Sequence, residues 1–357
     1  MKLISKYLKP YLWFVVIITF LTIVRGVTEL LLPSLLGNFI RDGIDAGNTT
    51  VMWKYALIML AITIVGTAAV ILSSYFEART STSFGYDLRI AVYEKVNEFS
   101  IEELNSFTIS SLITRSTQDI QQLQQVTNMS LRMLILQPVL AVGGIIFAIQ
   151  THAPLSIVIA VGIISLLLLL TLIFVVSVPK FNVMQQITDQ INLVTRETLS
   201  GTKVIRAFGG DELQHEKIDK VNKDFYKIGR FINAFMVMTW PFMSVVLGLI
   251  GVLILYLGAT KYVNINEFGY ESLISLNIYA TRVIMAFMMM SFMFVMVPRA
   301  LVSARRIREV LDTEQSIKDP ENPILIEKVE DKMVATLDDD KKITFSGSVE
   351  FRDVCFQ

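Results

Sequence analysis

Two ionisable residues interrupt the first long apolar stretch of the chain. Arg25 and Glu29 are four positions apart, so a helix places them on one face. Charges inside an apolar segment are costly, and they usually point into a bundle, where they often serve function. Arg282 is the only other basic residue deep inside such a stretch, and it can either pair with Glu29 or face a cavity by itself. Two interpretations remain: a polar patch that lines a passage, or an ion pair that fixes helix packing.

The last apolar stretch also carries methionines at helical spacing. Met285, Met289, Met293 and Met296 occupy positions i, i+4, i+8 and i+11. Thioether side chains are flexible and polarizable, so a stripe of them suits a surface that accepts apolar molecules of several shapes. The alternative is methionine that packs in a core or faces lipid. Together with the three ionisable residues, Met285, Met289 and Met293 form the candidate cavity.

Six long apolar stretches must position these residues. Each has about 19 residues or more, enough to cross a hydrocarbon layer of about 30 Å as a helix. The second and fourth connections have about 54 to 56 residues, whereas the others have about 4 to 16. We therefore expect an all-α membrane protein with nearly all of its extra-membrane mass on one side. The stretches are residues 11–36, 53–76, 133–151, 155–178, 233–260 and 272–298.

The composition agrees with a membrane protein and disfavours several kinds of site. Hydrophobic residues make up 53% of the chain and charged residues 18%, against about 25% charged residues in an average soluble domain. The net charge is zero, so no nucleic-acid partner is indicated. The single cysteine, Cys355, rules out an internal disulfide and a cysteine-based metal cluster. His152 and His215 are far apart in sequence, which disfavours a metal site.

The distribution of positive charge predicts the orientation. Of the 32 Lys and Arg residues, only Arg41, Lys54 and Lys261 lie in or beside the short connections. Basic residues close to helix ends carry most weight in orienting membrane proteins, and here they flank the long connections and the termini. We therefore expect a multi-pass protein of the cell membrane with both termini and both long connections in the cytoplasm.

The long connections, residues 77–132 and 179–232, are called the first and second extension. Apolar residues recur in both at helical spacing, as at Leu88, Val92 and Phe99 in the first. We expect helices two to five to continue past the membrane for about 25 residues, or roughly 40 Å, and to form two helical hairpins. The alternative is two small cytoplasmic domains.

Each extension needs a tip where the chain reverses. In the first, Ser100 and Glu103 form the pattern of a capping box, which predicts a short helix across the end of the hairpin. In the second, Gly209 and Gly210 break the helical pattern, and Asp211 is placed to cap the returning helix.

Apolar residues at both tips predict contact with another surface. Leu104 and Phe107 lie at the first tip and Phe208 at the second. Exposed apolar side chains at such positions indicate docking onto a partner. The alternative is local packing within each tip.

Three segments together resemble the transmembrane half of ATP-binding-cassette (ABC) exporters. Residues 111–119, S-L-I-T-R-S-T-Q-D, are similar to the family's G-x-L-x-S-R-x-x-x-D segment. Residues 197–208 are similar to E-x-x-x-G-x-x-x-[IV]-[KR]-x-[FY], and residues 304–312 to the stretch that closes the sixth helix. Ser110 and Ser111 replace the Thr-Gly of many members, which resembles the variant in members that form heterodimers. The resemblance covers essentially residues 1–312.

The resemblance implies that the two tips are coupling helices, which carry motion between ATP-hydrolysing domains and the membrane cavity. In the family, the second hairpin reaches the nucleotide-binding domain of the partner subunit. The implied coupling residues are Ile101, Glu102, Leu104, Phe107, Phe208, Asp211 and Glu212.

The composition changes after Asp312. Residues 313–346 are polar and contain two prolines, and we interpret them as a linker. Residues 347–357 have a strand-like pattern similar to the first strand of the family's nucleotide-binding domain. The phosphate-binding sequence G-x-x-x-x-G-K-[ST] is absent, so we expect no ATP hydrolysis by this chain alone. Either the chain is a fragment of a longer transporter, or its cassette lies on another chain.

The sequence thus predicts the membrane-spanning part of an ATP-driven exporter that works as a homo- or heterodimer by alternating access. Its expected cargo is an amphipathic small molecule, lipid or peptide, and ATP and Mg²⁺ are implied only for the full-length transporter. Two other classes stay open. An ion-gradient transporter would favour broken, Gly/Pro-interrupted helices in inverted repeats, and a non-transporting scaffold or sensor would dock a soluble partner through its hairpins.

Overall fold

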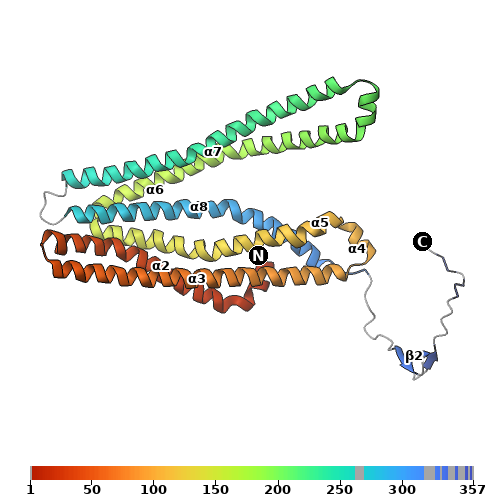
Figure 1. Cartoon of the computed structure of the whole chain (residues 1–357), viewed down its shortest axis with the longest axis horizontal. Helices are drawn as coiled ribbons and strands as arrows, with labels where there is room; N and C mark the ends of the chain where they lie inside the picture. The colour runs from red at the N-terminus through yellow and green to blue at the C-terminus, as the bar shows by residue number, and fades with distance from the viewer. Residues whose placement is uncertain are drawn as a thin grey trace.

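A computed structural model describes residues 2–261, 269–316, 326–329, 332–336, 342–344, 350–352, 354 and 355. Helices form nearly all of the first 312 residues, and a small sheet follows (Figure 1). The helical elements are α1 (Lys2–Leu8), η1 (Lys9–Tyr11), α2 (Leu12–Asn38), η2 (Phe39–Asp45), α3 (Thr49–Asn97), α4 (Ile101–Ser106), α5 (Ile109–Thr114), η3 (Arg115–Asp119), α6 (Ile120–Ala207), α7 (Asp211–Lys261) and α8 (Tyr270–Asp312). The strands are β1 (Ile326–Val329), β2 (Lys332–Thr336) and β3 (Lys342–Thr344).

The described residues contain five helical segments that are long and apolar enough to cross a membrane. The sequence predicts six apolar stretches, and the third and fourth both lie in α6. This helix has non-helical backbone angles at His152, where φ is −163° and ψ is 101°. In Figure 1 the chain reverses its direction within α6, and α8 lies between the two halves. Five helices therefore contain six apolar stretches.

A tight turn joins the first two spans. The segment η2 is a π-helix, and Gly47 follows it with a φ of 64°, a conformation that favours glycine. The side chain of Asn48 then accepts a hydrogen bond from the backbone N–H of Val51, at 3.3 Å, and caps α3. The corresponding connection between α7 and α8, residues 262–268, lies outside the described residues.

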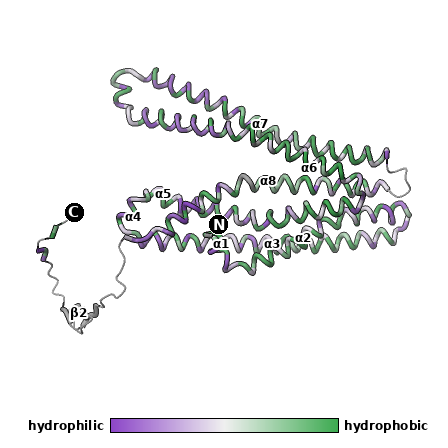
Figure 2. The backbone as a smooth tube through the Cα atoms, turned by 180° about the vertical axis from the view of Figure 1, so that it is seen from behind, coloured by the Kyte–Doolittle hydropathy of each residue, from purple (hydrophilic) through white to green (hydrophobic). Residues whose placement is uncertain are grey.

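Hydropathy divides the molecule along its length. In Figure 2 hydrophobic backbone fills the end that holds α2 and the adjoining spans, whereas hydrophilic residues become frequent towards the hairpin tips. At the apolar end, α2, α6, α7 and α8 share one core, in which Leu166, Ile254 and Leu276 are fully buried. This division supports the prediction that the helices run from a membrane into water.

The first extension packs against a second core outside the apolar end. Leu88 and Val92 of α3 are fully buried there, together with Ile120 of α6 and Ile307 of α8. The predicted stripe of the first extension is thus confirmed, and so is its continuation of α3 to Asn97. The core also takes in Leu3 of α1, so the N-terminal segment packs on the same bundle.

The second extension is packed much more thinly. It consists of the end of α6 and the start of α7, and it diverges from the rest of the bundle in Figure 1. Ile187 and Ile232 are buried near its base, but no residue in 211–231, all of which the structure describes, is buried. Both hairpins are helical, as predicted, but the second has little core of its own.

The segment after α8 differs from the sequence interpretation. Residues 313–346 were expected to be a linker, but they contain β1, β2 and β3 in an antiparallel sheet of that order. Ile326 pairs with Ala335 in one ladder, and Val334 pairs with Thr344 in the other. Each strand has only 3 to 5 residues, which is too short to give a clear alternating pattern in the sequence. The polar composition and the prolines of this segment therefore led to the linker prediction.

The strand predicted for residues 347–357 is not confirmed. Of this range the structure describes Glu350, Phe351, Arg352, Val354 and Cys355, and none of these lies in a strand. All five of these described residues are exposed.

The buried core of the first extension gives a stability prediction. Replacing Phe84, which is fully buried, by alanine should lower the free energy of unfolding by about 3–5 kcal/mol because it leaves a cavity. The matched control is Tyr86→Ala on the same helix, where the side chain is 61% exposed. Thermal unfolding of both variants in detergent measures the difference. Equal stability of the two variants would contradict the packing described here.

Candidate functional site

The three ionisable residues of the apolar stretches meet in one cluster. The Nε of Arg25 donates to Oε1 of Glu29 at 2.9 Å within α2. The Nη1 of Arg282, from α8, lies 3.2 Å from the other carboxylate oxygen of Glu29. One carboxylate therefore pairs with two guanidinium groups, and the cluster of three side chains has a net charge of +1. Arg282 is about half exposed, whereas Arg25 and Glu29 are about three-quarters buried.

Two hydrogen bonds next to this cluster fix α8 against α2. The hydroxyl of Tyr279 donates to the carbonyl of Leu30 at 3.1 Å, and that of Ser275 donates to the carbonyl of Pro33 at 2.7 Å. Neither residue is among those predicted from the sequence. Their spacing, i and i+4 on one face of an apolar helix, was the available signal.

The methionines of α8 do not share one environment. Met293 is 4% exposed and packs in the bundle, which agrees with the alternative of core methionine at that position. Met285 and Met289 are half-buried. The charged cluster therefore adjoins a part of α8 whose first two methionines keep some free surface in this chain.

The first tip is built by a capping box. Ser100 accepts from the backbone N–H of Glu102, and the backbone N–H of Ser100 donates to Glu103 at 2.7 Å. The hydroxyl of Ser100 also contacts the Glu103 carboxylate. The predicted short helix is thus confirmed as α4. The second carboxylate oxygen of Glu103 accepts from the backbone N–H of Ser316 at 2.8 Å, so the tip also holds the chain that leaves α8.

The predicted exposure of Leu104 and Phe107 is wrong. Both are half-buried against the core of the first extension, and Phe107 stacks on Phe99 with ring centroids 6.0 Å apart. The exposed apolar residues of this tip are Ile101, at 78%, and Ile109, at 73%. Sequence periodicity does not separate these cases, because Leu104 and Phe107 pack against a core formed by residues that are far apart in the sequence. Glu102, also predicted at this tip, is exposed.

Two charged residues of the 111–119 segment join the first hairpin to α8. The Nη1 of Arg115 donates to the carbonyl of Arg306 at 2.7 Å and lies 3.0 Å from the carboxylate of Glu309. Asp119, which is buried, accepts from the hydroxyl of Ser303 at 2.8 Å and pairs with Arg306 at 3.4 Å. Two of the segments that resemble the family therefore contact each other.

The second tip is a tight reversal with a highly exposed phenylalanine. In Figure 1 the last part of α6 turns across the end of the hairpin before the chain enters α7. The backbone N–H of Gly210 donates to the carbonyl of Ile205 at 2.8 Å, and Gly209 has a φ of 63°, which closes the helix. Phe208 lies directly after α6 and before these two glycines. Its side chain is 86% exposed, as predicted. Asp211 lies in the first turn of α7 and does not precede it as a cap.

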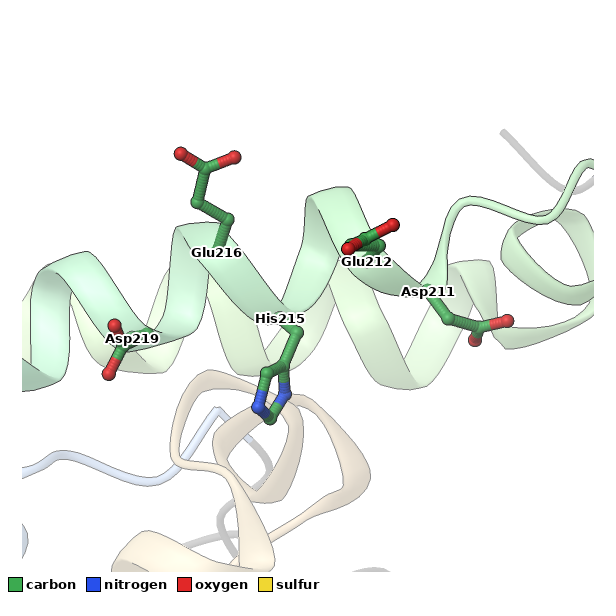
Figure 3. A pocket seen from close by; sticks show the side chains of 5 residues that line it. All are labelled: Asp211, Glu212, His215, Glu216 and Asp219. Atoms are coloured by element: carbon green, nitrogen blue, oxygen red, sulfur yellow. The ribbon is translucent and has the colours of Figure 1, made fainter.

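Acidic residues follow this tip along α7. Figure 3 shows Asp211, Glu212, His215, Glu216 and Asp219 around a shallow surface pocket, with side chains that point in different directions. The described residues contain no group of three or more His, Cys, Asp or Glu side chains that could hold a metal ion. Acidic residues in the first turn stabilise a helix N-terminus, which accounts for Asp211 and Glu212.

The hydrogen bonds of Glu103 predict a response to acid. They favour its carboxylate and lower its pKa from 4.5 to about 2, with Ser100 as the largest cause and Ser316 next. Because the folded pKa is the lower one, this stabilisation is complete above pH 4.5 and is lost as the pH falls towards 2. A nitroxide on Ile101→Cys in a Cys355→Ser background should therefore become more mobile over that range.

The matched controls isolate this carboxylate. Glu103→Gln should give a mobile label at every pH, and Glu102→Gln, at the exposed neighbour, should behave like the parent protein. A label on Tyr93→Cys of α3 reports any general unfolding in acid. If the label at position 101 has the same mobility at pH 5 and pH 2 in the parent, the role assigned to Glu103 is wrong.

The charged cluster also gives a stability prediction. Glu29→Gln removes the carboxylate between the two guanidinium groups, so we expect the free energy of unfolding to fall by about 1–3 kcal/mol. The double variant Glu29→Gln, Arg282→Gln should recover part of that loss, because one unpaired charge is removed as well. Thermal unfolding of the single and double variants in one detergent measures this coupling. Additive effects would show that the contact does not fix helix packing.

Comparison with known proteins agrees with this geometry. The sequence model of the ABC transporter transmembrane region matches residues 15–288. An uncharacterized ABC transporter ATP-binding protein of Mycobacterium tuberculosis is 29% identical over 90% of this chain and 55% of its own length. Another, YfiB of Bacillus subtilis, is 28% identical over 99% of this chain and 58% of its own length. An ATP-dependent lipid A-core flippase of Psychrobacter cryohalolentis is 20% identical over 62% of this chain and 37% of its length.

The chain thus spans about half the length of these curated relatives. The family match covers most of the helical part, including both extensions, the charged cluster and the turn within α6. The apolar helices are long enough to span a membrane. The chain therefore belongs to the ABC transporter transmembrane region family.

Proposed function

We propose that this chain is the membrane-spanning part of an ATP-driven exporter. It crosses the cell membrane six times, with both termini in the cytoplasm, and it exposes a central cavity to either side in turn. The observation that carries the proposal is the pair of helical hairpins that continue from the apolar bundle into a polar region (Figure 2). Both tips lie at the same end of the molecule (Figure 1). Such an arrangement suits the transfer of motion from a soluble domain to the spans.

The tips are the proposed contacts with nucleotide-binding domains. Ile101 and Phe208 are the most exposed apolar side chains of their respective tips and would enter apolar recesses on the partner domain. Glu102, Asp211 and Glu212 are exposed beside them and would contribute polar contacts at the rim. Leu104 and Phe107 would not contact the partner domain themselves. They would support the tip, because they pack against the core of the first extension and hold α4 in place.

ATP and Mg²⁺ would bind in cassettes outside these 357 residues. The sequence contains no G-x-x-x-x-G-K-[ST] loop, and the described residues contain no carboxylate cluster that fits a metal ion. We therefore assign no ATP site to this chain. The match to relatives named as ABC transporter ATP-binding proteins, whose length is nearly twice what the chain covers, supports cassettes elsewhere.

A second transporter half is the proposed partner in the membrane. The second extension has no buried residue over 211–231, a described range in which Leu213 is 63% exposed and Tyr226 is 62% exposed. A hairpin with so little core gains stability when another chain covers it. The divergence of this hairpin from the rest of the bundle in Figure 1 leaves it free to reach such a chain.

The cargo is proposed to be an amphipathic small molecule, lipid or peptide. Arg25, Glu29 and Arg282 supply a polar centre with one net positive charge in the apolar part of the molecule. Met285 and Met289 offer adaptable apolar surface on the same helix as Arg282, and Met293 supports it from the core. The printed name of the Psychrobacter relative, a lipid A-core flippase, is consistent with an amphipathic cargo.

The coupling role of the second tip can be tested directly. In the full-length protein in liposomes, Phe208→Asp should keep basal ATPase activity but lower transport and substrate-stimulated ATPase activity by about tenfold, since it loses one buried aromatic anchor. Leu193→Asp is the matched control, because Leu193 is 60% exposed on the same hairpin and lies well below the tip. Unchanged transport in Phe208→Asp would contradict the coupling role.

A further inference from the structure

A groove lies beside the N-terminal segment where this segment meets the bundle. It lies between α1 and η1 on one side and α6 and α8 on the other, and its volume is about 870 Å³, within the range of about 300–1,000 Å³ that is typical of small-molecule sites. Its walls are mainly apolar, with Leu8 and Leu12 from the N-terminal segment facing Leu134 of α6 and Leu301 of α8. The charged cluster and the hairpin tips contribute no residue to this groove.

The groove has few polar groups, and the charge among them is positive. Lys9 is the only charged residue among those that line it in the described part of the chain, and it is exposed. Ser5, Thr127 and Ser130 add hydroxyl groups. A site with an apolar wall, three hydroxyls and a single ammonium group is complementary to an amphiphile with a negative head.

The groove lies where the spans meet the cytoplasmic bundle. Leu12 lies at the start of α2 and of the first apolar stretch, Leu134 and Ile135 lie near the start of the third stretch, and Val297 lies near the end of the sixth. Ser5 and Lys9 precede the first span in the chain, and Thr127 precedes the third. The apolar part of the groove is therefore level with the end of the hydrocarbon layer, and its polar part is level with the lipid head groups.

We propose that this groove binds an anionic phospholipid of the cytoplasmic leaflet. One acyl chain lies along Leu12, Leu134 and Leu301, and the phosphate pairs with Lys9, with hydroxyls of Ser5 and Ser130 nearby. The lipid fills the space between the N-terminal segment and the spans, so it joins α1 to α6 and α8. This inference requires the chain to span a membrane, but it does not depend on export or on the identity of the cargo.

Native mass spectrometry of the purified full-length protein in detergent tests the proposal. The probes are phosphatidylglycerol and phosphatidylcholine with identical acyl chains, added without nucleotide. We expect phosphatidylglycerol to be retained preferentially, and Lys9→Gln to weaken its apparent affinity about fivefold, the usual effect of one basic residue near an anionic head group. Lys6→Gln is the matched control, because Lys6 is exposed on the same segment, lies over the ring of Tyr7 and does not line the groove.

A second variant tests the apolar wall independently of charge. Leu134→Ser, at a side chain that is 54% exposed, should weaken binding of both lipids by a similar factor and keep the preference for phosphatidylglycerol. Equal retention of both lipids by the parent protein would overturn the proposal and indicate general annular lipid only. Equal losses in Lys9→Gln and Lys6→Gln would also overturn it. Because no nucleotide is present, neither result depends on whether the protein transports anything.

Discussion

Continuous backbone hydrogen bonding from the membrane to the hairpin tips is the constraint on which the other features depend. A helix that crosses lipid must satisfy its polar backbone internally, and α3, α6 and α7 continue in the same helical form far beyond the apolar stretches. Such a helix can transmit displacement along its axis, because a sharp bend would require an interruption of its backbone hydrogen bonds. The charged cluster lies on α2 and α8, and contacts of Arg115 and Asp119 tie α8 to the first hairpin.

The two hairpins are attached to this frame in different ways. The first is tied to α8 by Arg115 and Asp119, and its tip holds Ser316 through Glu103, so hairpin, α8 and the following chain form one packed unit. The second has a thin interface of its own and diverges from the bundle (Figure 1). One hairpin is thus fixed to α8, whereas the other has little core of its own. Under the proposed function, this asymmetry suits a transporter in which two chains move relative to each other.

Local rules predict the parts of this structure that local interactions determine. The capping box of Ser100 and Glu103 and the reversal at Gly209 depend on neighbours in sequence, and both were predicted. The exposure of Leu104 and Phe107 was predicted wrongly, because periodicity defines a helix face but not the element that covers it. The short strands after α8 and the merging of two stretches in α6 at His152 also depend on contacts and geometry that have no sequence signal of their own. The charged cluster was predictable only in part. The i, i+4 spacing predicts that Arg25 and Glu29 share a helix face, whereas the contact with Arg282 depends on the packing of α8 on α2.

Amide hydrogen exchange along both extensions, in the full-length protein in lipid nanodiscs, tests most directly whether the hairpins are continuous helical connections. Slow exchange should extend from the spans through residues 77–97 and 120–132 of the first hairpin. In the second it should extend through residues 179–207 and 211–232, with fast exchange confined to the turn at Gly209. Exchange at the rate of unstructured chain across the middle of either extension would contradict the account, because a hairpin that opens there cannot carry motion from its tip to the membrane.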